Sequence, residues 1–292
     1  MISSELNLLT PHVYWLPPKR ETCRPALGAV SGQQSLLMVD AGNSPTHASA
    51  FLEGLHRCIL PVPSYLFLTH WRWDHVFGSP IVEALLVASN HTSEHLRETA
   101  RLDWRDKSLD QRVEDGLETD FYRNCLKTEM SNVERGRIKL HLPDISFSQS
   151  MDIVLENVTC RLIALGDEKT SDASLLYVPE DEVVFLGECL GGMASSAPHI
   201  DTPDRFIAML DKILELPAQI YIGSQRSKPL SRADLEKEIV LIKKIGKAAL
   251  DSQGNRPAAI SQLKKDLGAS LPQSAEAHLD AFLTAMRRAN GA

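Results

Sequence analysis

An apolar run that ends in side chains of the metal-ligand type is the strongest constraint on this chain. The segment YLFLTHWRWDHVFG covers residues 65–78, and its first part has the branched and aromatic composition of a buried strand. His70 ends the run, and a short loop then supplies Asp74 and His75 before Gly78. The pattern predicts a strand whose end presents imidazole and carboxylate groups together, as a metal site requires.

Other short apolar runs rich in branched residues predict further strands. They are SLLMVD (35–40), LLVAS (85–89), RLIAL (161–165), SLLYVP (174–179), EVVFLGE (182–188) and IYIGS (220–224). Helical stretches separate several of them, such as 45–58, where Phe51, Leu52 and Leu55 share one face. Alternation of strands and helices predicts a mixed α/β class.

The chain of 292 residues is expected to form one large domain with two helical additions. Residues 92–135 carry many charges, with apolar residues spaced for partly exposed helices, and predict a helical insertion or rim. After residue 230 the pattern is wholly helical, with Ser231 as a cap and Pro257 in a first helical turn. We therefore expect a main domain over 1–230 and a C-terminal helical segment over 231–292 packed on it.

Composition and cysteine spacing limit the classes of binding partner and the cellular compartment that we expect. The net charge of −7, without a dense Lys/Arg run, argues against nucleic acid. No basic and apolar leader opens the sequence and no run of 18 apolar residues occurs, so no membrane partner is expected. The five cysteines are widely spaced, with no CxxC pair, which suits mostly buried thiols in a reducing compartment. The predicted location is cytoplasmic.

The loop at 70–75 resembles the metallo-β-lactamase superfamily, whose signature is His-x-His-x-Asp-His, and reads His-Trp-Arg-Trp-Asp-His here. VDAGNS (39–44) resembles the family's early Asp-Ala-Gly turn, and YVPEDEVVFLGEC (177–189) its hairpin before a bridging carboxylate. The order and spacing fit through about residue 235. The resemblance implies a four-layer αββα sandwich with the site at one edge and, in this chain, extra C-terminal helices.

The resemblance also implies which residues stand at the family's metal-ligand positions. In the first metal site the family's three histidines correspond to His70, Arg72 and, by alignment of LGDEKTSDASLLYVP, Lys169. In the second site its ligands correspond to Asp74, His75 and Glu188. The family's final histidine falls at Ser224 or Gln225 in IGSQRSKPL.

Two ligand positions have thus become cations, and a cation opposes metal binding. Arginine has no lone pair to give, and lysine must first lose its proton. A unit charge about 4 Å from a divalent ion is repelled by roughly 8 kcal/mol at an effective dielectric near 20. Structural zinc sites gain only about 10–16 kcal/mol in total. The sequence therefore predicts a metal-poor, hydrolase-like protein that is not an ordinary dizinc hydrolase and retains a small-molecule pocket.

In this charge-substitution hypothesis, Arg72 and Lys169 stand where metal charge would be and pair with Asp74 and Glu188. The alternative is a single-metal hydrolase that holds zinc, iron or manganese through His70, Asp74, His75 and Glu188. Neighbouring loops would add Asp167, Glu168 or His199.

In the alternative, Arg72 and Lys169 hold an anionic ester, thioester, lactone or similar small molecule. The predicted catalytic residues are Asp74, Lys169 and Arg72, and the predicted cofactor is none or one divalent metal ion. Exposed apolar faces on the C-terminal helices would suit a homodimer.

The remaining candidates have simpler explanations. His91 and His95 have the four-residue spacing of a helical zinc pair, but no third ligand is near in sequence, which favours a surface helix. Cys189 follows Glu188 and is interpreted as a buried structural thiol, with a thiolate nucleophile as the alternative. His47, with other lone histidines, is expected to be solvated.

Overall fold

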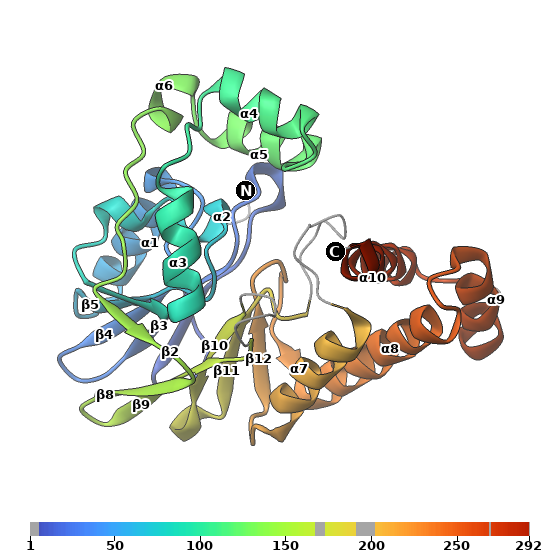
Figure 1. Ribbon diagram of the computed structural model, residues 1–292. Coiled ribbons are helices and arrows are strands. Elements are labelled where there is room, and N and C mark those ends of the chain that lie inside the picture. Colours follow the sequence, from blue (N-terminus) through green and yellow to red (C-terminus); the bar gives the residue numbers. More distant parts are fainter. Residues whose placement is uncertain (1–5, 167–172, 191–201, 269, 292) are drawn as a thin grey trace.

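The computed structural model describes residues 6–166, 173–190, 202–268 and 270–291, and its strands form two sheets (Figure 1). The first sheet has seven strands in chain order, antiparallel from β1 to β4 and parallel from β4 to β7. They are β1 (Asn7–Leu8), β2 (Val13–Leu16), β3 (Leu27–Ser31), β4 (Leu36–Val39), β5 (Pro63–Phe67), β6 (Leu85–Ser89) and β7 (Ile145–Phe147).

The second sheet has six strands in the order β13-β12-β11-β10-β9-β8. All neighbours in it are antiparallel except β11 and β12. Its strands are β8 (Ser150–Leu155), β9 (Val158–Ala164), β10 (Ser174–Val178), β11 (Val183–Gly187), β12 (Ile220–Gly223) and β13 (Leu230–Ser231).

The two sheets face each other across an apolar core. In β4 every side chain is buried, because Leu37 and Val39 point into this core while Leu36 and Met38 point to the helices outside. This explains why the strand is a continuous apolar run rather than an alternating one. Gly28 in β3 allows the close approach of the sheets, since a Cβ there would lie 2.1 Å from the ring of Phe185.

Helices cover the outer face of each sheet (Figure 1), so the predicted α/β sandwich of four layers with extra C-terminal helices is confirmed. The first sheet packs against α1 (Pro45–Arg57), α2 (Trp73–Val76), α3 (Asn90–Thr99), α4 (Asp106–Glu114) and α5 (Asp120–Glu129). The second packs against α7 (Pro203–Glu215), α8 (Arg232–Asp251), α9 (Arg256–Leu267) and α10 (Gln273–Gly291).

Local capping follows the sequence signals. Ser44 caps α1 and accepts from the His47 amide at 3.0 Å, and Pro45 takes its first turn. Ser231 caps α8 as predicted, and Pro257 lies in the first turn of α9.

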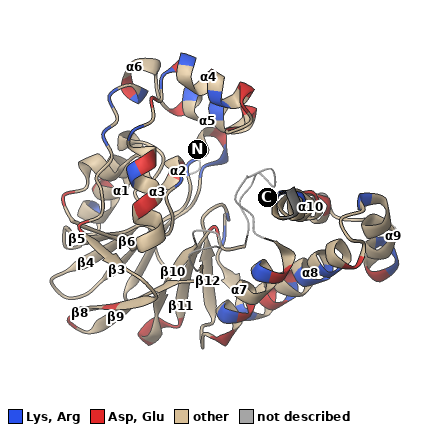
Figure 2. Ribbon diagram, viewed as in Figure 1, with Lys and Arg blue, Asp and Glu red and all other residues tan. Residues whose placement is uncertain are grey.

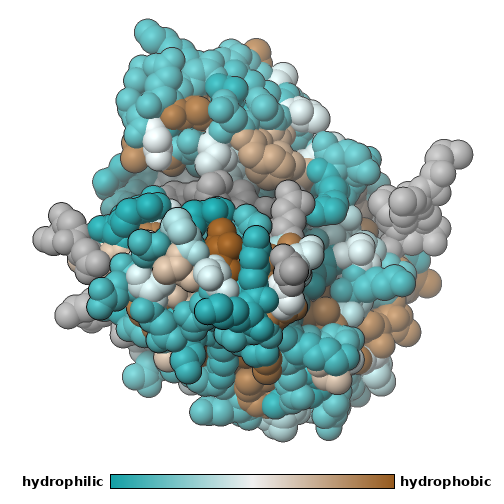
Figure 3. All heavy atoms as spheres, turned by 90° about the vertical axis from the view of Figure 1, so that its right-hand side faces the viewer, coloured by the Kyte–Doolittle hydropathy of each residue, from teal (hydrophilic) through white to brown (hydrophobic). Residues whose placement is uncertain are grey.

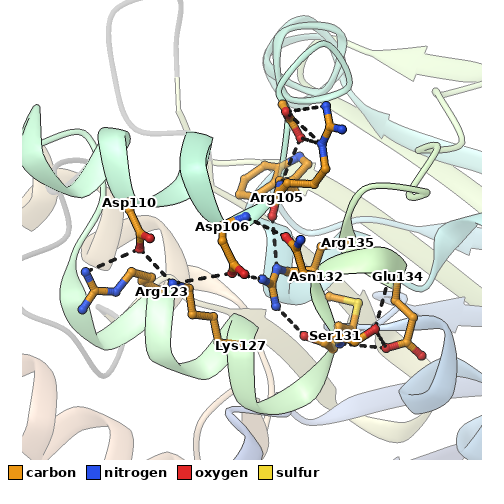
Figure 4. Close-up of polar contacts among 12 residues, drawn as sticks. Arg105, Asp106, Asp110, Arg123, Lys127, Ser131, Asn132, Glu134 and Arg135 are labelled. Atoms are coloured by element: carbon orange, nitrogen blue, oxygen red, sulfur yellow. Dashed lines mark hydrogen bonds and ion pairs between the residues drawn. The ribbon is translucent and has the colours of Figure 1, made fainter.

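The predicted rim, residues 92–135, contains α3 to α5 and the short α6 (Asn132–Arg135). A polar network joins α4, α5 and α6 (Figure 4). Lys127 lies 2.8 Å from Asp110 and 3.5 Å from Asp106, and Asp106 also pairs with Arg135. The buried Arg135 donates to the Trp104 carbonyl at 3.1 Å, so its charge is paired and its donors are used.

The prediction of thiols is wrong for two of the five cysteines. Cys23, next to β3, and Cys125, in α5, form a disulfide across 102 residues of sequence. Of the free thiols, Cys160 and Cys189 are buried, whereas Cys58 is exposed. Disulfides are more typical of oxidising compartments. The cytoplasmic location stays a prediction, and this pairing argues against it.

Charges of both signs are spread over the outer faces of the helices (Figure 2). Hydrophilic residues predominate on the face drawn in Figure 3, where hydrophobic residues form small separate patches. In the described ranges, no helix has the length and apolar character needed to cross a membrane.

His47 is buried, with 2% exposure, so the expectation of a solvated side chain is wrong. Its Nδ1 makes no hydrogen bond with the described residues. Burial, together with the charges of Arg24 and His75, lowers the pKa of His47 to about 3. The folded chain therefore keeps this imidazole neutral in mild acid.

We predict that His47 makes folding acid-sensitive. As pH falls below about 6.5 the unfolded state takes up a proton that the folded state does not, so this stability is present above pH 6.5 and is lost below it. Between pH 7 and pH 4 the loss is about 3 kcal/mol. Urea unfolding of His47→Gln should show a correspondingly weaker pH dependence. The exposed control His56→Gln should behave as wild type; identical pH profiles for all three would refute the assignment.

Candidate metal centre

The edge of the sandwich where β5 and β11 end brings the predicted ligands together. His70 follows β5, α2 carries Asp74 and His75, and Glu188 follows β11. His70, Asp74 and His75 are all buried, and each offers a ligand atom within 4.8 Å of the others. His75 Nε2 also lies 3.8 Å from Glu188 Oε1. Two segments that are distant in sequence, residues 70–75 and the end of β11, thus build one cluster.

Asp40, at the end of β4, organises this cluster although the sequence had not singled it out. Its buried carboxylate accepts from the Thr69 amide at 2.8 Å and contacts His75 Nδ1 at 2.8 Å. Asp40 adopts a left-handed backbone (φ 59°), which aspartate and asparagine tolerate better than most residues. The carboxylate fixes the His75 ring with Nδ1 toward itself and Nε2 toward the cluster.

Thr69 links Asp40 to His70 and orients the His70 ring. Its hydroxyl lies 2.9 Å from Asp40 Oδ2 and 2.8 Å from His70 Nδ1. The hydroxyl has one proton, and a carboxylate can only accept it, so the His70 ring donates from Nδ1 and keeps a lone pair on Nε2. Gly187 leaves room for this hydroxyl, because a Cβ there would lie 2.6 Å from Thr69 Oγ1. Both histidines are thereby oriented with Nε2 toward the cluster.

Arg72 points into the cluster. Its Nη1 donates to Glu188 Oε2 at 2.6 Å, and its Nε lies 3.8 Å from Asp74 Oδ1. The guanidinium carbon lies 4.5 Å from the ring centre of Tyr122 in α5, a cation–π distance. The Arg72 cation is therefore paired with the Glu188 carboxylate.

The electrostatics of the cluster follow from these contacts. Burial would lower the pKa of His75, but Asp40 and Asp74 outweigh it and raise the pKa to about 10 when no metal competes. Burial is also the main cause that raises the pKa of Asp74. For Glu188 the burial effect is overcome, chiefly by Arg72, and its pKa is lowered. In Arg72 the desolvation effect is likewise outweighed by Glu188 and Asp74, which raise its pKa.

The helical rim covers Arg72. Tyr122 lies in α5, whose middle is tied by the disulfide of Cys125 and whose end is held by Glu129, which accepts from Arg24 at 2.8 Å. Burial raises the pKa of Glu118, just before α5, to about 7, although the charge of Arg72 acts to lower it. Sequence reasoning missed these residues, since their distance from the motif leaves no local signal.

Other residues predicted for the site either lie outside the described part of the chain or are buried near the cluster. Lys169, with Asp167, Glu168 and His199, lies outside the described residues, so its catalytic role stays a prediction. Ser224 is buried beside the cluster strands and its amide donates to the Gly187 carbonyl at 3.1 Å. Gln225 Oε1 is buried without a hydrogen bond in the described part of the chain. Cys189 is buried at 2% exposure.

The residues fit one metal ion. Asp74 Oδ1 and His75 Nε2 are buried and make no hydrogen bond to any described residue, although each could accept or donate one. Buried polar atoms that make no hydrogen bond are costly unless something binds them. Two imidazoles and a carboxylate within 4.8 Å form a donor set that suits zinc, iron or manganese.

The family model described as "Metallo-beta-lactamase superfamily" matches residues 28–222, and the chain belongs to this superfamily. No curated protein matches the sequence significantly. Three similar solved structures share the fold at low sequence identity.

A metallo-beta-lactamase from Pontibacter korlensis has a TM-score of 0.60 at 14% identity, over 82% of this chain and 98% of its own. TMB-1, a protein whose structure was studied for substrate and inhibitor binding, has a TM-score of 0.57 at 13% identity, over 82% of this chain and 97% of its own. The sec-alkylsulfatase Pisa1 from Pseudomonas sp. has a TM-score of 0.66 at 12% identity; the match covers 97% of this chain and half of that protein.

The role assigned to Asp40 predicts a large effect of Asp40→Asn. Asparagine suits the same left-handed backbone but removes the charge that holds His75. In metal-stripped protein at pH 7, urea unfolding should show a loss of about 2–4 kcal/mol, and the pKa of His75, followed by NMR, should fall. Asp152→Asn, which breaks only an exposed pair with Arg161, should cost less than about 1 kcal/mol. Equal stability of Asp40→Asn and wild type would show that Asp40 does not organise the cluster.

Proposed function

We propose that this chain is a hydrolase-like member of the superfamily whose centre accepts one divalent metal ion instead of two. The observation that carries the proposal is the 2.6 Å contact between Arg72 Nη1 and Glu188 Oε2. This contact places a permanent positive charge beside Glu188, the carboxylate that the family resemblance puts between the two ions of a dizinc site.

The charge balance of the described cluster supports a single ion. With both histidines neutral, three carboxylates (Asp40, Asp74, Glu188) and one guanidinium leave two negative charges. One divalent ion neutralises them. Two ions would leave two positive charges in a buried site, which low-dielectric surroundings penalise strongly.

The proposed ligands are His70 Nε2, His75 Nε2 and Asp74, with Glu188 Oε1 as the fourth group. A bound ion supplies a more acidic water or polarises a carbonyl. Asp40 and Thr69 keep both imidazoles oriented, and Arg72 keeps Glu188 ionised. Asp74 is also the proposed proton acceptor, through the carboxylate oxygen that would not hold the ion.

A metal-free small-molecule binding protein is the second candidate, and the same contacts favour it. Arg72 already pairs with Glu188 and lies near Asp74, so both carboxylates have a cation without any metal. In this state the proton on His75, held by Asp40 and Asp74, takes the place of the ion. The two candidates differ in the expected effect of a chelator, which should reduce the activity and stability of the metal enzyme but not the stability of the binding protein.

The proposed substrates are small esters, thioesters, lactones or similar anionic molecules. The fold similarity to Pisa1, named as an inverting sec-alkylsulfatase, adds secondary alkyl sulfates to the compounds worth testing. Fold alone does not select among these chemistries.

A chelator experiment separates the candidates. We expect zinc- or manganese-loaded protein to hydrolyse at least one of these compound classes. Added chelator should abolish this activity and lower the melting temperature by several degrees. Asp74→Asn should lose both responses while its circular dichroism stays native. A melting temperature that neither metal nor chelator changes, together with no hydrolysis, would favour the binding protein.

A further inference from the structure

We propose that His91 and His95 form a second, separate site for a divalent transition-metal ion on α3. The two histidines lie one helical turn apart, and their Nε2 atoms are 3.0 Å from each other. In the absence of metal one ring donates a hydrogen bond to the other. A metal ion would replace that single proton.

The distance suits chelation by both rings. Metal–imidazole bonds are about 2.0–2.1 Å long. Nitrogen atoms 3.0 Å apart then subtend about 95° at the ion. This angle is close to that of square-planar or tetragonal coordination, so Cu²⁺ and Ni²⁺ should bind better than tetrahedral Zn²⁺, in keeping with the general affinity order.

The surroundings of His95 prepare it as a ligand. Its ring stacks on Trp71 with centroids 5.0 Å apart, which fixes the ring plane. Its other nitrogen, Nδ1, lies 3.6 Å from the Glu98 carboxylate, an arrangement that keeps Nε2 directed at His91. Burial and the neighbouring His91 lower the pKa of His95, so the ring is neutral and able to bind a metal at pH 7.

The site has room for the remaining ligands. His91 and Glu94 line a cavity of about 1150 Å³ between the start of α3 and strands β8 and β9. Water or a small ligand in this cavity can complete the coordination. His91 and His95 are only half-buried, whereas His70, Asp74 and His75 are buried. Trp71, a member of this ring stack, directly follows His70 in the sequence, so a bound ion would also reinforce the loop that carries the first centre.

The test is a Cu²⁺ titration of the full chain at pH 7.5, followed by equilibrium dialysis and by tryptophan fluorescence. Wild type should bind one ion more than His91→Gln or His95→Gln, or bind that ion at least about tenfold more tightly, because each variant loses chelation. Cu²⁺ at His95 should quench Trp71. Trp71→Phe should therefore keep the binding and lose most of the quenching.

The control is His56→Gln, which removes an exposed histidine outside the pair and should leave binding unchanged. Equal stoichiometry and affinity in wild type and both His91 and His95 variants would overturn the proposal. An equal loss in His56→Gln would show adventitious binding only and would overturn it as well. The outcome does not depend on the first centre, whose ligands stay intact in every variant.

Discussion

The buried carboxylate of Asp40 is the interaction on which the centre depends. It joins the end of β4 to the Thr69 amide after β5 and to His75 in α2, so it holds together two strand ends and the short helix that follows the second strand. Through the Thr69 hydroxyl it also sets the proton position of His70. A single acceptor thus determines that both imidazoles present Nε2 to the same point. Without it, two histidines on a tight loop would have no common orientation, because either ring nitrogen could face the cluster.

The second constraint is the charge of Arg72. A guanidinium cannot lose its proton in a protein, and this one is enclosed by Glu188, Asp74 and the ring of Tyr122. The helical rim is therefore more than a cover: α5 carries Tyr122, and the disulfide and Glu129 tie the middle and the C-terminal end of that helix to the segment around Cys23 and Arg24. The fold keeps the cation in place, and the cation limits how many metal ions the carboxylates can share.

The sequence was most informative where chemistry is local. Each predicted strand is present, and a continuous apolar run such as 36–39 is buried on both faces. The capping residues Ser44 and Ser231 mark helix starts as expected. Contacts between distant segments could not be predicted. Nothing near Cys23 indicates Cys125, nothing near Arg72 indicates Tyr122, and His47 was expected in solvent although the turn at Gly42 encloses it. The Asp-Ala-Gly turn that supported the family resemblance already contained Asp40, but only its position beside His75 gives it a role.

The count of zinc ions bound per chain at saturation tests the central claim most directly. Protein stripped with chelator, dialysed against excess zinc at pH 7.5 and freed of weakly held metal should retain one equivalent that depends on His70, Asp74 and His75. The Asp74→Asn variant should retain none of it. Two tightly held equivalents that both depend on this cluster would contradict the account, because Arg72 would then not prevent the carboxylates from sharing two ions.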